Sequence, residues 1–202
     1  SLYAKSKVNA EKYILSFAEK TRMNPTILRF ATAFGLSPRM RFDLTISEFT
    51  RDLAMGKELL VYDSNTWRPY CHVQDFSQLI QKVLEAPIKD TSFQVFNAGG
   101  EENNATKQMI VNLIIDRIPN GKVKYQEKGN DPRNYKVDFE KVKKVLGFKP
   151  RFSIEDGIDE LIKVINKNIF NNVEDNINFF GNYKIDYKEL IWTSIYHYVS
   201  HH

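Results

Sequence analysis

Apolar and polar residues alternate along the 202-residue chain in a way that predicts a regular order of helices and strands. Between Val8 and Ala18, apolar residues recur at helical spacing with Lys and Glu between them, which predicts a helix over residues 3–21. Two short apolar runs, at residues 26–31 and 93–98, are typical of buried strands in a parallel sheet. The pattern therefore indicates a mixed α/β chain.

Further helices are predicted from the polar residues that precede their apolar stretches. Asp43, Thr106 and Ser153 each stand where an N-cap is expected, and the first of them opens a predicted helix that ends near Gly56. Asp75 is followed three residues later by Gln78, which is the pattern of a capping box. The resulting order of strand, helix, strand, helix favours an α/β protein with parallel strands.

Composition and charge restrict the classes of partner. The 29 basic and 25 acidic residues are interspersed, so we interpret them as solvated helix faces and expect no nucleic-acid partner. No apolar run approaches the roughly 20 residues of a membrane span, so we expect no membrane partner. The single cysteine, Cys71, allows no internal disulfide and fits a cytoplasmic protein. The four histidines show no metal-ligand spacing, so no metal site is expected, and we interpret Cys71 and His72 as packed core residues.

The first turns of the predicted N-terminal helix carry Tyr3 and Lys7. Residues four apart on a helix share one face, with Cβ atoms about 5–6 Å apart. A free phenol has a pKa of about 10, and a nearby ammonium lowers it. The pair can therefore act as a general acid and base. A Tyr-x-x-x-Lys pattern also arises by chance, with an exposed Tyr lying on a Lys stem, and the pattern alone leaves both interpretations open.

Five blocks in sequence order carry a more specific signal. They read YAKSKVNAEKY, PTILRFATAFGLSPRMRFD, WRPYCHVQDFSQLI, FQVFNAGG and NYKVDFEKVKKVLGFKP. From Tyr3 to about Ile165, the chain resembles the C-terminal part of the extended short-chain dehydrogenase/reductases, the NAD-dependent nucleotide-sugar epimerases and dehydratases. The resemblance implies an α/β fold, with the C-terminal part of a Rossmann-like parallel sheet and a small α/β substrate domain.

The resemblance also implies a division of the chain. Residues 1–36 and 67–98 would form the end of the dinucleotide-binding Rossmann domain. Residues 37–66 and 99–165 would form the domain that binds the nucleotide sugar. The remaining stretch, 166–202, is rich in Asn and is predicted to be a C-terminal extension without an assigned role.

The resemblance gives four residues roles at the cofactor. Tyr3 matches the base that takes a proton from a sugar hydroxyl while a hydride leaves for NAD. Lys7 would hold the nicotinamide ribose and lower the pKa of Tyr3. Ala31 and Thr32 match positions that line the nicotinamide and, for Thr32, also the sugar. The cofactor implied is NAD rather than NADP.

Other residues match positions around the nucleotide diphosphate. Asp43 and Leu44 match a substrate-contacting pair, although a carboxylate beside a diphosphate is unfavourable, so Asp43 is also interpreted as a helix cap. Arg68 matches the diphosphate ligand, as the bidentate geometry of Arg suits phosphate, with a surface salt bridge as the alternative. Arg133 is a second candidate contact or a surface residue. The strand that passes the base comprises Leu60, Val61 and Tyr62.

The phosphate-binding motif Gly-x-x-Gly-x-x-Gly of this family does not occur in the 202 residues. The acidic residue for the adenosine ribose and the catalytic Ser or Thr also have no match. We therefore expect a chain that begins within an enzyme and needs the N-terminal half for NAD binding. Without it, the strands at 26–31 and 93–98 would expose apolar side chains. A homodimer through a helix such as 3–21 is a further expectation, as relatives commonly pair in this way.

The expected activity is NAD-dependent epimerisation or dehydration of a nucleotide-diphosphate sugar by transient hydride transfer, with Tyr3 as the base. Two alternatives remain open at this point. One is an NADP-linked sugar reductase, which the Tyr and Lys pair does not distinguish. The other is an inactive remnant or a module that binds a nucleotide sugar through Arg68 without binding NAD.

Overall fold

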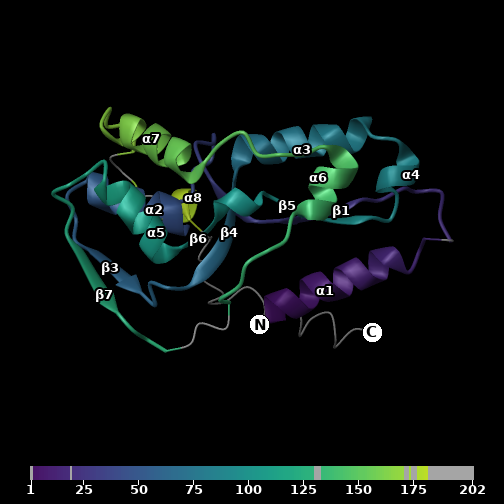
Figure 1. The fold of residues 1–202 in the computed structure, drawn as a ribbon, viewed down its shortest axis with the longest axis horizontal. Coiled ribbons are helices and arrows are strands. Elements are labelled where there is room, and N and C mark those ends of the chain that lie inside the picture. Colours follow the sequence, from purple (N-terminus) through teal and green to yellow (C-terminus); the bar gives the residue numbers. More distant parts are fainter. Residues whose placement is uncertain (1, 19, 130–132, 171–172, 174–176, 182–202) are drawn as a thin grey trace, which may run out of the picture.

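The computed structural model describes residues 2–18, 20–129, 133–170, 173 and 177–181 (Figure 1). Its elements are, in chain order, α1 (Leu2–Leu15), β1 (Ile27–Phe30), β2 (Thr32–Phe34), α2 (Thr45–Ala54), β3 (Leu59–Tyr62), β4 (Trp67–His72), α3 (Val73–Glu85), α4 (Ile88–Thr91), β5 (Val95–Ala98), a short 3₁₀ helix (Glu101–Asn103), β6 (Asn104–Thr106), α5 (Lys107–Ile115), β7 (Val123–Gln126), α6 (Glu140–Leu146), α7 (Ile154–Ile165) and α8 (Ile177–Phe180). No helix among these residues is long and apolar enough to cross a membrane.

Among the described strands, three of the four pairings are parallel. β1 pairs with β5, β2 with β4, and β3 with β7, whereas β4 pairs with β6 in the antiparallel sense. Parallel partners need a crossover between them, which explains why helices separate the paired strands in sequence. The predicted α/β class with a Rossmann-like parallel sheet is confirmed.

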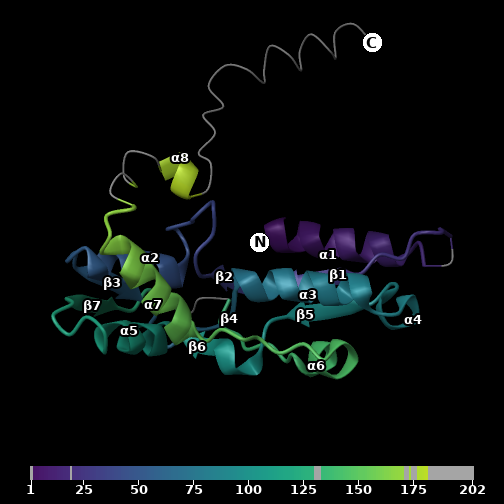
Figure 2. The same cartoon turned by 90° about the horizontal axis from the view of Figure 1, so that it is seen from above.

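One hydrophobic core, here called the sheet core, lies against β5. Leu79 of α3, Phe96 of β5 and Val142 of α6 are fully or almost fully buried in it. Each such side chain contributes about 1.5–3 kcal/mol by its removal from water. Figures 1 and 2 show α3 and α6 beside the β1–β5 pair. The sheet core comprises Leu79, Phe96, Ala98, Phe139, Val142, Leu146 and Phe148.

A second and larger core, here called the helical core, lies among α2, α5 and α7. Ile46, Ile110 and Leu161 represent the three helices and have at most 1% of their surface exposed. α7 has its buried residues at positions 154, 157, 158, 161 and 165, which is the spacing of one helix face. β4 supplies Tyr70 to this core. β4 thus runs next to the helical core, while α3, which follows it directly, packs on the sheet core.

Helix α1 lies along β1 and contributes no buried residue (Figure 2). A salt bridge joins the two elements, because Arg29 Nε donates to Glu11 Oε2 at 2.8 Å. Among the described strands, β1 pairs only with β5. The expected exposure of apolar side chains is confirmed at Phe30, which is 49% exposed, but it is wrong for β5, whose Phe96 is fully buried.

Two predicted N-caps are wrong. The cap position of α2 is Leu44, and Asp43 instead forms a two-pronged salt bridge with Arg41 at 2.9 and 2.6 Å. A charged bidentate partner two residues away competes successfully with the backbone N–H groups. α3 begins at Val73 rather than at Asp75, and the ring of His72 accepts the hydrogen bond that caps it.

Asp75 does not form the predicted capping box and binds the backbone of another segment instead. Its side chain is completely buried and accepts hydrogen bonds from the backbone N–H groups of Arg151 and Phe152 at 3.0 and 3.1 Å. It therefore ties the segment before α7 to the start of α3. The other two predicted caps are confirmed, because Thr106 accepts from the third residue of α5 and Ser153 forms a full capping box with α7.

Candidate active site

Tyr3 and Lys7 lie on one face of α1, as their spacing predicts. The Lys7 ammonium is 5.4 Å from the centre of the Tyr3 ring. The Tyr3 side chain is 72% exposed, and Lys7 is exposed as well. Figures 1 and 2 show that the N-terminal end of α1 lies near the middle of the molecule and its other end at the periphery. Both side chains are open to a ligand at this end of the helix.

A cavity of about 410 Å³ opens where β1 and β5 end. Ala31 lines it directly after β1, and Asn97 lines it from β5. The amide of Asn97 donates to the carbonyl of Asp138 at 3.0 Å and so fixes the segment that closes the cavity on the other side. A crevice outside the carboxyl ends of parallel strands is the usual position of a ligand site in open α/β sheets.

The other predicted residues of the cofactor and sugar region do not line this cavity. Thr32 begins β2 and pairs with Tyr70 of β4. Leu44 lines a smaller cavity of about 80 Å³ together with Ala33. Asp43 is engaged by Arg41, as described above. The structure thus separates the position of Leu44 from the cavity lined by Ala31.

The three predicted residues of the strand beside the base differ in their orientation. Val61 is fully buried in the helical core, so its side chain does not reach the surface. Leu60 is 43% exposed, and Tyr62 is half-buried. This alternation is that of a strand with one face on a core. Leu60 and Tyr62 are the two members whose side chains can meet a ligand.

Arg68 lies beside the segment that contains Arg133. The guanidinium carbon of Arg68 is 5.6 Å from the centre of the Tyr135 ring. The backbone N–H of Trp67 donates to Asn134 Oδ1 at 2.9 Å, which anchors the segment immediately after Arg133. The two predicted arginines are therefore brought into the same region of the molecule, from β4 and from the segment before α6.

Two lysines that the sequence analysis did not single out also lie in this region. The Lys128 ammonium is 3.5 Å from the centre of the Tyr62 ring, and the Lys136 ammonium is 3.6 Å from the centre of the Trp67 ring. A cation over an aromatic face is stabilised by the ring quadrupole. The signal available in the sequence was the basic stretch on both sides of the predicted Arg133, within nine residues of chain from Lys128 to Lys136.

The buried polar residues of β4 support the fold rather than chemistry. Burial raises the pKa of the Cys71 thiol and raises the pKa of Tyr70 to about 12. His72 is fully buried, contacts Glu160 at 3.0 Å and stacks on Phe152 with ring centres 4.3 Å apart. The interpretation of Cys71 and His72 as packed core residues is confirmed.

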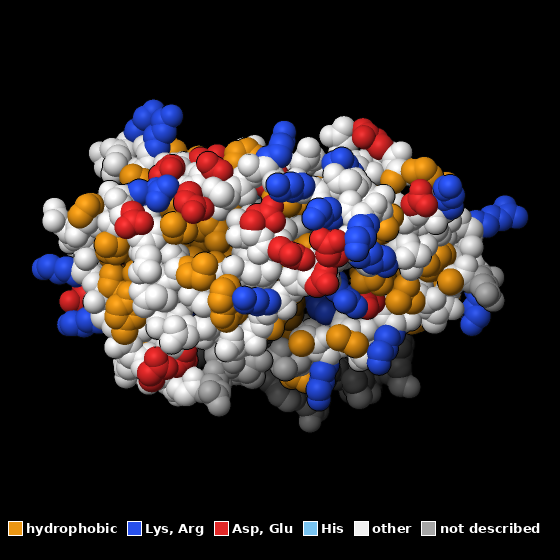
Figure 3. All heavy atoms as spheres, in the orientation of Figure 1, with side chains coloured by type: hydrophobic (Ala, Val, Ile, Leu, Met, Phe, Trp, Pro, Cys, Tyr) orange, Lys and Arg blue, Asp and Glu red, His pale blue; other side chains and the backbone are white. Residues whose placement is uncertain are grey.

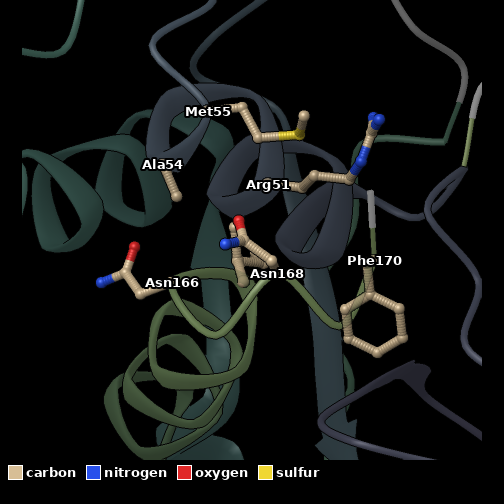
Figure 4. Close-up of a pocket in the computed structure, with 7 residues that line it drawn as sticks. Arg51, Ala54, Met55, Asn166, Asn168 and Phe170 are labelled. Atoms are coloured by element: carbon tan, nitrogen blue, oxygen red, sulfur yellow. The ribbon is translucent and has the colours of Figure 1, made fainter. Parts of the chain in front are cut away.

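A further cavity of about 310 Å³ lies between α2 and the end of α7 (Figure 4). Figure 4 shows that the side chains of Arg51 and Asn166 point in different directions, so the polar groups of its wall do not converge. Arg51 contacts Asp52 at 3.3 Å.

The described residues contain no group of three or more His, Cys, Asp or Glu side chains that could hold a metal ion. Basic and acidic side chains are interspersed on the face in Figure 3.

The fold is that of a mixed α/β protein with a Rossmann-like parallel sheet. Residues 1–99 match the model described as "NAD dependent epimerase/dehydratase family". Over these residues the chain is similar to that family, as the sequence blocks predicted.

Similar proteins extend the likeness beyond the first half of the chain. The chain is 25% identical to a UDP-glucuronate 4-epimerase of Thermodesulfobacterium geofontis, over 84% of this chain and 51% of that protein. It is 27% identical to a dTDP-glucose 4,6-dehydratase of an Actinoplanes species, over 80% of this chain and 50% of that protein. The chain thus spans about half the length of these curated relatives.

Solved structures agree with this assignment. The structure of a dTDP-glucose 4,6-dehydratase of Bacillus anthracis in complex with NAD superposes with a TM-score of 0.71 at 27% identity, covering 83% of this chain and 53% of that one. A UDP-glucose 4-epimerase of Thermotoga maritima with UDP-glucose gives a TM-score of 0.69 at 25% identity, covering 83% and 54%.

Proposed function

We propose that this chain provides the substrate-binding part and a share of the catalytic groups of an enzyme that epimerises or dehydrates a nucleotide-diphosphate sugar. NAD, when bound, accepts a hydride from a sugar carbon and later returns it. The observation that carries the proposal is the exposed pair of Tyr3 and Lys7 at the central end of α1, the helix that lies along β1 (Figure 2). The match of residues 1–99 to the family model and the named relatives support the same class of reaction.

The residues of this chain transfer a proton and position the reacting groups. The Tyr3 oxygen takes the proton of the sugar hydroxyl as the C–H hydride leaves the same carbon, so the alcohol becomes a carbonyl and the proton stays on Tyr3. Lys7, four residues away, places its ammonium 5.4 Å from the centre of the Tyr3 ring, from where it would hold the nicotinamide ribose. Donation of the proton back to the oxygen accompanies hydride return in an epimerase.

The residues at the nicotinamide end fit the cofactor. Tyr3 and Lys7 are accessible, and the small side chain of Ala31 borders open space. The adenosine end has no counterpart here, because the 202 residues contain no Gly-x-x-Gly-x-x-Gly motif. We therefore propose that NAD binding uses a glycine-rich half in addition to these residues, and that the predicted division at 1–36 with 67–98 and 37–66 with 99–165 describes two domains.

The nucleotide diphosphate is assigned to the region around Arg68. Arg68 and Arg133 bring guanidinium groups to it, and Leu60 and Tyr62 provide the surface beside the base. Lys128 adds an ammonium that is 3.5 Å from the Tyr62 ring. Two phosphate groups carry negative charge that such a collection of cations neutralises.

A second candidate is a module that binds the nucleotide sugar without NAD. The cations around Arg68 belong to the described chain and provide the contacts that such a module needs for the diphosphate. Calorimetric titration with UDP-glucose and with NAD separates the two: binding of both supports the enzyme, and binding of the sugar nucleotide alone supports the module.

The enzyme proposal is tested with the protein purified from its source. UDP-glucose, UDP-glucuronate and dTDP-glucose are incubated with it and NAD, and products are separated by chromatography and weighed by mass spectrometry. An epimer or a dehydrated product supports the proposal, and no conversion of any of the three contradicts it. Two proposals remain. A cytoplasmic location is tested by fractionation of the source cells, and a homodimer through α1 is tested by light scattering of the purified protein.

A further inference from the structure

Asp63, directly after β3, has an uncommon backbone conformation for a residue with a side chain. Its φ is 48°, in the left-handed region that only Gly, Asn and Asp visit with any frequency. Its N–H donates to the carbonyl of Gln126 at 3.0 Å, which continues the pairing of β3 with β7 by one residue. A residue persists in this strained conformation only when the surrounding contacts compensate the strain.

The compensating contacts come from the turn after β7. Asp63 Oδ1 accepts hydrogen bonds from the backbone N–H groups of Lys128 at 2.8 Å and of Gly129 at 3.3 Å. A carboxylate that accepts from backbone N–H groups forms charge-assisted bonds, which are stronger than neutral ones. The side chain of Asp63 therefore holds residues 128 and 129 against the end of β3.

The same turn fixes the position of an ammonium group. The Lys128 ammonium lies 3.5 Å from the centre of the Tyr62 ring, so that it covers one face of the ring. Tyr62 is itself held, because its carbonyl accepts from the Lys107 ammonium at 2.6 Å. With that ring face occupied, a base cannot stack on it.

We propose that Asp63 is a positioning residue for the phosphates of the substrate: it fixes the Lys128 backbone so that the ammonium, resting on Tyr62, presents its remaining N–H donors to a nucleoside diphosphate. The inference rests on the proposed function and adds to it a residue that sequence reasoning did not single out. This role also explains why a carboxylate is tolerated near a phosphate site. The backbone N–H groups of Lys128 and Gly129 both donate to Asp63 Oδ1, so the carboxylate is engaged by the turn.

Simple electrostatics and positioning predict opposite results when the charge of Asp63 is removed. Loss of a negative charge near a phosphate site strengthens phosphate binding by Coulomb attraction alone. Loss of the positioning contact weakens it, because the Lys128 ammonium must then be ordered during binding. The sign of the change in UDP affinity therefore separates the two explanations.

The experiment measures UDP binding to the full chain by calorimetry for wild type, Asp63→Gly, Lys128→Gln and the double variant. Gly tolerates the backbone at this position, so Asp63→Gly removes the carboxylate without adding strain. We expect about tenfold weaker binding for Asp63→Gly, the size of one charge-assisted hydrogen bond. Asp116→Asn, on the exposed end of α5, removes the same charge and leaves the affinity unchanged.

The double variant shows whether Asp63 acts through Lys128. In the Lys128→Gln background, Asp63→Gly is expected to cause no further loss of UDP affinity. If the two residues contributed independently, the two fold-losses in affinity would multiply. Multiplied losses, or tighter binding of Asp63→Gly, overturn the inference. Hydrogen exchange at the amides of Lys128 and Gly129 must also accelerate in Asp63→Gly, and unchanged exchange overturns it as well. If wild type fails to bind UDP at millimolar concentration, the proposed function fails together with this role, while the exchange rates still show whether Asp63 holds the turn.

Discussion

The Lys7 ammonium lies 5.4 Å from the centre of the Tyr3 ring, on the exposed face of a helix that has no buried residue. The side chains are thus placed by the helix alone and not by packing. A second tyrosine of α1, Tyr13, is similarly exposed, at 68%. It provides a matched control for the role of Tyr3.

Tyr3→Phe is expected to lower kcat by about 10²–10⁴, the range of a lost general acid or base, with little change in KM. Lys7→Met is expected to lower kcat as well and to raise the KM for NAD. Tyr13→Phe changes neither constant. Steady-state rates with the nucleotide sugar that the enzyme converts provide the check, and an active Tyr3→Phe enzyme would remove Tyr3 from the mechanism.

Gly35 lies against the ring of His72 and has a φ of 92°. A Cβ at Gly35 would stand 1.9 Å from His72 Nε2, so Gly35→Ala forces the buried ring and its contact with Glu160 to move. We expect a loss of about 3 kcal/mol or more in the free energy of unfolding, because strain and overpacking add.

Gly56→Ala is the control for this prediction. Gly56 has a comparable φ of 72°, but a Cβ there meets nothing within 4 Å. Its expected cost is the backbone term alone, about 1–2 kcal/mol. Urea denaturation measures both variants, and equal losses would show that the contact with His72 carries no weight.

The capping box at the start of α7 makes stability depend on acid pH. Hydrogen bonds from the backbone and side chain of Ser153 hold the pKa of Asp156 below its ordinary value of 3.8. A carboxyl with a lowered folded-state pKa stabilises the fold above its unfolded pKa and loses this contribution as pH falls through the folded one. Wild type should therefore lose stability more steeply than Asp156→Asn below about pH 4. Parallel slopes in urea titrations over this range would contradict the assignment.

Cys71 is fully buried, and burial raises the pKa of its thiol. The thiolate is the reactive form, so the native protein should react with a thiol reagent only as fast as it opens. The reaction rate is expected to rise in proportion to the unfolded fraction as urea is added. Rapid labelling without urea would place Cys71 at the surface.

Sequence blocks were sufficient for the class of fold. Local patterns were sufficient for the strands β1 and β5 and for the caps at Thr106 and Ser153, because an apolar run and an N-cap depend on neighbours in sequence. The cap proposed at Asp75 failed for a different reason. Asp75 binds the backbone of residues 151 and 152, a contact across 76 and 77 positions that no local pattern reveals.

The candidate site was predictable to a similar extent. The spacing of Tyr3 and Lys7 fixed their common face, and the family blocks indicated Arg68 and Tyr62. Lys128 was missed because its partner is the Tyr62 ring, which pairing of β3 with β7 brings to it. The side chain of Val61 was included although it lies in the core, because a strand match does not indicate which face is buried.

The most direct test of the account is to follow the absorbance of reduced NAD while the protein from its source converts a nucleotide sugar. The account predicts a transient rise in reduced NAD during turnover, a return to the oxidised form at completion, and neither signal with Tyr3→Phe. Conversion of the sugar without reduced NAD at any time, or a full transient in Tyr3→Phe, would contradict the proposed transfer of hydride with Tyr3 as the base.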